Sequence, residues 1–171
     1  QTLGAEQRFR VTPAWQTRVR VMDPAKDDHG PHARTVYPLD PAWREGRPAD
    51  IRQTEVSTSG NALQLDITLA RHVDAWQAPM GFDHVALTVF IELPNTEVGS
   101  RVLPLQQGEL PEDMRWHYRL RLHGWSNALF SADGADADHE GRLITPGARL
   151  QVDAQQATWH IQFTGTALGN P

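Results

Sequence analysis

The sequence predicts an all-β domain, a two-sheet antiparallel β-sandwich formed by residues 1–171 as one unit. Apolar and polar residues alternate with a period of two in at least five segments, and turn residues separate these segments. A helix needs apolar residues at positions i, i+3, i+4 and i+7, and no window of useful length provides them. A chain of 171 residues is also long enough to bury a sizeable core in a single domain.

About eight to ten short strands are expected along the chain. The turn Ser59-Gly60-Asn61 joins two of them and predicts a β-hairpin. The expected strands cover residues 7–11, 18–22, 51–58, 62–69, 85–93, 114–123, 127–132, 149–152 and 158–163. The inward positions of these strands predict a core that contains Leu63, Leu65, Ile67, Leu87, Val89, Ile91, Leu120 and Ile161.

The segment 114–123 shows what the alternation predicts for individual side chains. Trp116 is in phase with the apolar residues of the segment and is expected in the core, as is Trp159 in the last strand. His117 and His123 fall on the opposite face of the strand, where we expect histidines exposed to solvent.

Composition and motifs exclude several classes of function. The net charge of −5 argues against a nucleic-acid partner, because binding phosphates needs a basic face. The absence of cysteine excludes disulfides, thiolate metal sites and cysteine nucleophiles. We find no G-x-S-x-G, no phosphate-binding glycine loop and no H-E-x-x-H motif, so no catalytic site is predicted.

The apolar runs and the first residue of the sequence bear on the cellular location of the protein. No apolar run approaches the length that a membrane-spanning helix requires. The sequence starts at Gln1 and shows no signal peptide, so we expect a processed product or a module taken from a longer protein.

The loop of residues 21–51 is unusually long for a compact domain, and such loops are commonly functional. Asp23, Asp27 and Asp28 lie near its start and Asp50 lies at its end, so the flanking strands are expected to bring these carboxylates together. Like charges repel at short range, and calcium binds carboxylate and carbonyl oxygens. The sequence therefore predicts a site for calcium or a similar hard cation. The alternative is that Asp23 and Asp50 cap turns by accepting hydrogen bonds from backbone amides.

Aromatic residues in proline-rich loops suggest a second kind of site. Tyr37 and Trp76 lie in loops that Pro38 and Pro79 stiffen, and exposed aromatic faces can hold sugar rings through C–H contacts. The candidate ligand-binding residues are Tyr37, Asp74, Trp76, Gln77 and Asp83. The alternative, which also applies to Trp43, is that these rings close the ends of the sandwich.

Several short motifs are distributed along nearly the whole chain. They are Asp23-Pro24-x-x-Asp27-Asp28-x-Gly30-Pro31, Tyr37-Pro38, Asp50-Ile51, Trp76-x-x-Pro79-x-Gly81-Phe82 and Gly124-Trp125. Together they resemble the C-terminal module of bacterial glucodextranases, and related modules are appended to some amylopullulanases. The resemblance implies a β-sandwich related to family-nine carbohydrate-binding modules and to DOMON domains.

The resemblance also implies a function. We expect a non-catalytic carbohydrate-binding or surface-attachment module of a bacterial α-glucan-degrading enzyme that is secreted, periplasmic or at the cell surface. Its partners would be a polysaccharide or cell-surface glycan and a catalytic glycosidase domain. One alternative is a DOMON-type haem domain with axial ligands from Met22, Met80, Met114 or a histidine. Another is a structural domain that packs on a catalytic partner.

Overall fold

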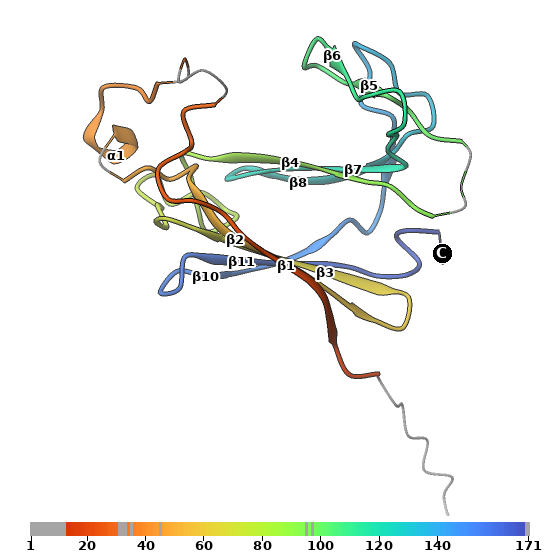
Figure 1. Cartoon of the computed structure of the whole chain (residues 1–171), viewed down its shortest axis with the longest axis horizontal. Coiled ribbons are helices and arrows are strands. Elements are labelled where there is room, and N and C mark those ends of the chain that lie inside the picture. Colours follow the sequence, from red (N-terminus) through yellow and green to blue (C-terminus); the bar gives the residue numbers. More distant parts are fainter. Residues whose placement is uncertain are drawn as a thin grey trace, which may run out of the picture.

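Two antiparallel sheets face each other and form a β-sandwich in this computed structural model (Figure 1). The structure describes residues 13–169 except 31–33, 35, 45, 95 and 97. The five-stranded sheet has the order β1-β2-β3-β11-β10, the four-stranded sheet has the order β4-β7-β8-β9, and β5 and β6 form a separate pair. The predicted all-β class is confirmed. The first expected strand, residues 7–11, lies outside the described residues.

Eight of the strands coincide with predicted segments to within a few residues, whereas β5, β6 and β9 are not among the predicted segments. The strands are β1 (Gln16–Met22), β2 (Ile51–Ser59), β3 (Ala62–Leu69), β4 (Ala86–Ile91), β5 (Val102–Leu103), β6 (Gly108–Glu109), β7 (Tyr118–His123), β8 (Ser126–Ser131), β9 (Arg142–Ile144), β10 (Arg149–Asp153) and β11 (Thr158–Phe163). One short helix, α1 (Pro41–Arg44), lies in the long loop between β1 and β2. In the part of the chain that the structure describes, no helix is long and apolar enough to cross a membrane.

The predicted hairpin is formed by β2 and β3. Val56 pairs with Leu65 and Thr58 with Leu63 across the antiparallel ladder. Gly60 adopts a φ of +56° in the connecting turn, a conformation that glycine adopts at little cost. The period-two pattern and the turn residues thus specify the same register.

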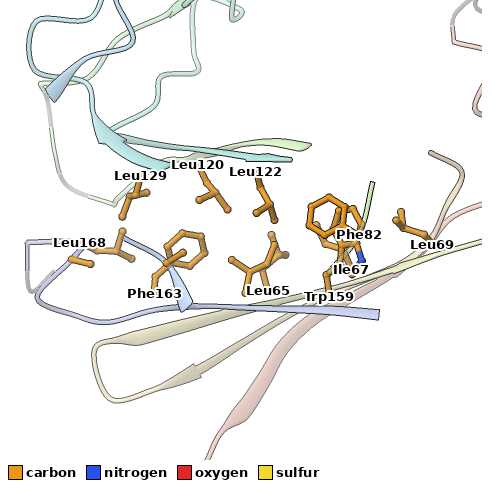
Figure 2. Packing of buried hydrophobic residues seen from close by; sticks show 13 residues of the cluster. Leu65, Ile67, Leu69, Phe82, Leu120, Leu122, Leu129, Trp159, Phe163 and Leu168 are labelled. Carbon is orange, nitrogen blue, oxygen red and sulfur yellow. The ribbon is translucent and has the colours of Figure 1, made fainter. Parts of the chain in front are cut away.

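The core fills the space between the two sheets (Figure 2). Four of the predicted core residues are buried, and the other four are partly buried and pack against the same cluster. The buried four are Leu65, Ile67, Leu120 and Ile161; the partly buried four are Leu63, Leu87, Val89 and Ile91. Trp159 is buried in this cluster, as predicted. Trp116 is buried as well, but it packs on Phe90, and its indole N–H donates to Val102 O of β5.

The outer face of the four-stranded sheet differs from the prediction. The β5–β6 pair lies above this face, beside the loop between β8 and β9 (Figure 1), and Leu105 N–H donates to Ala137 O at 2.9 Å. His117, predicted to be exposed, is buried against the segment that follows β4, where a Cβ on Gly99 would lie 3.0 Å from its Nε2. Its Nδ1 accepts a hydrogen bond from Leu93 N–H at 2.9 Å, so its Nε2 carries the hydrogen that is donated to Thr96 O at 3.1 Å.

A buried ion pair stabilises the same covered region. Glu140, in the loop before β9, accepts a hydrogen bond from Nη1 of Arg119 at 2.6 Å and forms an ion pair with Arg121 at 3.2 Å. Only 3% of the Arg119 side chain is exposed, and its guanidinium lies over the ring of Phe90. The charge of this arginine is therefore compensated by a carboxylate that lies 21 residues away in the sequence.

Strand β1 is the outermost strand of the five-stranded sheet. All seven of its residues are exposed, and Val19 and Val21 are among them. The register with β2 shifts between Thr17 and Val19, which marks a β-bulge or irregularity. Arg20 pairs with Glu55 of β2 at 2.5 Å.

Candidate functional site

Three rings from two segments of the chain stack at the end of the sandwich where α1 lies. Trp43 of α1 contacts His84 with ring centroids 4.7 Å apart, and His84 stacks on Trp76 at 4.1 Å with an interplanar angle of 29°. Trp43 is half-buried, His84 is buried and Trp76 is 57% exposed. This ring stack therefore presents the outer face of Trp76 to solvent.

A buried carboxylate fixes the ring stack from below. Asp83 is only 1% exposed. Its Oδ2 accepts a hydrogen bond from Trp76 N–H at 2.5 Å, and its Oδ1 bonds Nδ1 of His84. The neighbouring Phe82 is fully buried and packs on Trp159 with centroids 3.9 Å apart, so the loop that carries Trp76 is anchored to the core.

A second exposed indole lies next to Trp76. Trp125, in the turn between β7 and β8, is 55% exposed, and its ring centroid is 6.0 Å from that of Trp76 at an interplanar angle of 36°. Gly124 holds the two loops against each other, because its carbonyl accepts Met80 N–H at 2.9 Å. A Cβ on Gly124 would lie 2.5 Å from Phe82 O, so only glycine fits at this contact. We call Trp76 and Trp125 the tryptophan pair.

The structure brings four of the five predicted ligand-binding residues to this one loop. Trp76, Asp74 and Gln77 are exposed, and Asp74 Oδ1 also accepts Ala78 N–H at 3.2 Å. Asp83 lies beneath the rings, and hydrogen bonds within the protein engage both of its oxygens. Gln77 and His84 have positive φ values of 51° and 65°, which are uncommon for residues other than glycine and often mark functional loops.

Tyr37, the fifth predicted ligand residue, belongs to a different network. Its hydroxyl donates to Asp28 Oδ2 and accepts Ala49 N–H at 3.2 Å. Partial burial, the largest effect, raises the pKa of Tyr37 above its ordinary value, and the nearby charge of Asp50 acts in the same direction. The ring of Tyr37 lines an open groove with a volume of about 510 Å³, together with Arg44 and Arg47.

The structure brings two of the four predicted metal ligands together. Asp28 and Asp50 both face Arg47, which forms an ion pair with Asp28 and approaches Asp50 Oδ2 at 3.6 Å. Asp50 is fully buried, and its Oδ2 also contacts Arg52 at 3.0 Å. By contrast, Asp23 and Asp27 are exposed.

Two observations bear on whether calcium fits this loop. Oδ1 of Asp50 is buried and accepts no hydrogen bond, which leaves an oxygen available to a cation. However, the guanidinium of Arg47 already lies against both carboxylates, and among the described side chains no group of three His, Asp or Glu residues is close enough to hold a metal ion. Calcium binding stays a prediction. In the structure the positive charge beside Asp28 and Asp50 is the guanidinium of Arg47.

The methionines considered as haem ligands lie in different surroundings. Met22 and Met114 are exposed, whereas Met80 packs against the core. Haem binding stays a prediction, which the presence or absence of a Soret band in the absorbance spectrum would check.

Sequence reasoning missed two members of the site. Trp125 follows a strand within a short turn, and Gly124-Trp125 drew attention only as part of the family resemblance. His84 is one of eight histidines scattered through the sequence, and no spacing distinguishes it from the others. Trp43, considered as a ring that closes the end of the sandwich, proved to support the ring stack.

Comparison with known proteins adds one finding. A family model described as the C-terminal binding module, SLH-like, of glucodextranase matches residues 19–169. This range contains the ring stack, the tryptophan pair and the carboxylates of the long loop. No curated protein and no solved structure matches the chain.

Proposed function

Because the chain belongs to the family of SLH-like C-terminal binding modules of glucodextranase, we propose that it binds carbohydrate through the exposed face of Trp76. The family is one of binding modules, so the protein acts as a non-catalytic accessory module. In this proposal it attaches a catalytic glycosidase domain to a polysaccharide or cell-surface glycan outside the bacterial cell. Trp76, exposed on a supported ring stack, is the observation that carries the proposal.

The support beneath Trp76 favours binding. A weak sugar contact cannot also offset the cost of ordering a loop, so a ring that is already fixed binds more tightly. Here His84 stacks beneath the indole and Asp83 accepts the backbone N–H of Trp76. Asp83 therefore positions the ring, whereas the exposed Asp74 and Gln77 are the groups available to sugar hydroxyls.

The expected affinity is modest. By analogy with base–aromatic stacking, each ring contributes about 1–2 kcal/mol. Together with a few hydrogen bonds, one module would bind in the millimolar to micromolar range, roughly 4–8 kcal/mol. Such an affinity is sufficient for attachment of an enzyme to a polymer that offers many equivalent sites.

The test is a calorimetric titration of the module with α-glucan oligosaccharides. We expect saturable binding that weakens about 5- to 30-fold in Trp76→Ala, since 1.4 kcal/mol corresponds to tenfold. Trp15→Ala is the matched control, because Trp15 is also an exposed tryptophan but lies immediately before β1. Circular dichroism establishes that each variant is folded. Absence of binding by the wild type up to tens of millimolar oligosaccharide would contradict the proposal and leave a structural role.

A further inference from the structure

An open apolar groove lies at the end of the sandwich opposite the ring stack. It forms where the turn between β2 and β3 faces the end of β4, on the far side of the molecule from α1 (Figure 1), and its volume is about 330 Å³. Its apolar lining consists of Ala62, Leu63, Ile91, Leu93, Pro94 and Leu168. We propose that residues 7–11, which lie outside the described part of the chain, cover this groove, and that Phe9 fills it.

The groove leaves one end of the core open to solvent. Leu63 and Ile91 pack against the core cluster but are only partly buried. Thr58, Asn61 and Glu92 form the polar part of the lining. An apolar surface with a polar rim typically marks a contact site, because removing apolar area from water is favourable.

The described chain begins beside this groove. The carbonyl of Pro13 accepts a hydrogen bond from Oγ of Ser59, and Cγ of Pro13 lies 3.7 Å from the position that a Cβ on Gly60 would take. Gly60 itself lines the groove. Phe9 precedes Pro13 by four residues, so an extended chain carries it up to about 13–14 Å from Pro13. The groove is therefore within reach, and only a short connection has to be closed.

The sequence of residues 7–11 matches the groove. Phe9 and Val11 alternate with Arg8 and Arg10, so an extended segment has one apolar face and one basic face. Glu92 is the charged residue of the groove lining, and it is exposed. Its charge is complementary to the two arginines that flank Phe9. A second copy of the chain placed symmetrically over the groove would instead bring two Glu92 carboxylates together.

The test is a thermal melt of Phe9→Ala, Leu93→Ala and the double variant. Leu3→Ala is the matched control, because Leu3 is also apolar and N-terminal but lies outside the alternating segment. Because Phe9 is buried in the groove, Phe9→Ala should lower Tm by about 3–12 °C, whereas Leu3→Ala should leave it unchanged. Phe9 and Leu93 are in contact, so their effects are coupled, and the double variant should lose less than the sum of the two single losses.

Two results would overturn the proposal. One is a Tm for Phe9→Ala equal to that of Leu3→Ala, which would show that Phe9 is not buried. The other is strict additivity with Leu93→Ala, which would place Phe9 away from the groove. Light scattering identifies the alternative occupant, because a dimer that dissociates in Leu93→Ala but not in Phe9→Ala would assign the groove to a second copy. None of these outcomes depends on whether the module binds carbohydrate.

Discussion

Substitution of Gly124 by alanine tests the contact that joins the two loops of the site. The added Cβ would lie 2.5 Å from Phe82 O and 2.7 Å from the Cβ of Ala78, both closer than the 3.0 Å below which a neighbour must shift. Phe82 O is a backbone atom, so this clash cannot be relieved by the movement of a flexible side chain. Forcing an extra methyl group into a well-packed region typically costs about 1–3 kcal/mol.

The expected loss is measurable in a thermal melt. For a domain of this size, 1 kcal/mol corresponds to a shift of roughly 2–4 °C in Tm, so Gly124→Ala should lower Tm by about 2–12 °C. Gly108→Ala is the matched control, because its Cβ would meet the Leu103 side chain at 3.6 Å and Gln106 O at 3.8 Å, both ordinary van der Waals contacts. We expect the control to stay within about 0.5 kcal/mol of the wild type.

The same substitution should weaken sugar binding. If the module binds sugar through Trp76 as proposed, displacement of the neighbouring loop should lower the affinity of folded Gly124→Ala for α-glucan oligosaccharides. A variant that melts with the wild type and retains its affinity would refute the packing described for this contact.

Three further predictions concern charged and titratable groups. Glu140→Gln removes the carboxylate that two arginines share, so urea unfolding should show a free energy of unfolding lower by about 3–5 kcal/mol. Asp133→Asn, at an exposed ion pair, should lower it by only about 0–1 kcal/mol. Equal losses in the two variants would contradict the burial of the Glu140 pair. If Asp28 and Asp50 bind calcium, millimolar calcium should raise Tm relative to excess chelator, and an unchanged Tm would leave the arginines as their only cations. Because burial raises the pKa of Tyr37 above 10.0 in the folded state, the folded protein holds the phenolic proton more tightly, and the free energy of unfolding should fall as the pH rises above 10. Tyr37→Phe should show a shallower fall, and an identical slope would contradict this assignment.

Much of the fold could be predicted from the sequence because strand patterns are local. Leu63, Leu65 and Ile67 alternate with polar residues, and the turn before them contains glycine. Period two then specifies both the strand and the side chains that face inward. The same reasoning located β4, β7 and β11 without information on how the strands pair.

The wrong prediction for His117 has a physical cause. Alternation assigns a residue to one of the two faces of a strand, but it does not show whether another segment covers that face. Here Leu93, Thr96 and Gly99 of the irregular segment after β4 cover His117, and a segment without a strand pattern cannot be placed over a sheet from the sequence. Part of the outer face of the four-stranded sheet is therefore buried, although the alternation predicts it to be exposed.

The candidate site was predictable only in part for a similar reason. Proline and glycine near Trp76 indicated a stiffened loop, and the structure shows that loop with its ring exposed. The partners of Trp76 come from distant parts of the sequence, with Trp43 in α1 and Trp125 in the turn after β7. Such contacts depend on how the two sheets pack, which no local pattern contains.

The edge strand β1 has a consequence for modules that gather on one polymer. Many copies attached to a single polysaccharide are held at high local concentration, and an unpaired strand edge is the place where sheets of neighbouring copies join. In β1 the bulge near Thr17 interrupts the regular ladder, and the charged side chain of Arg18 lies beside the exposed Val19, whereas the charge of Arg20 is paired with Glu55. Pairing of two such edges would bring like charges together along an irregular backbone. If the module binds a polymer as proposed, crowded copies should therefore not join through this edge.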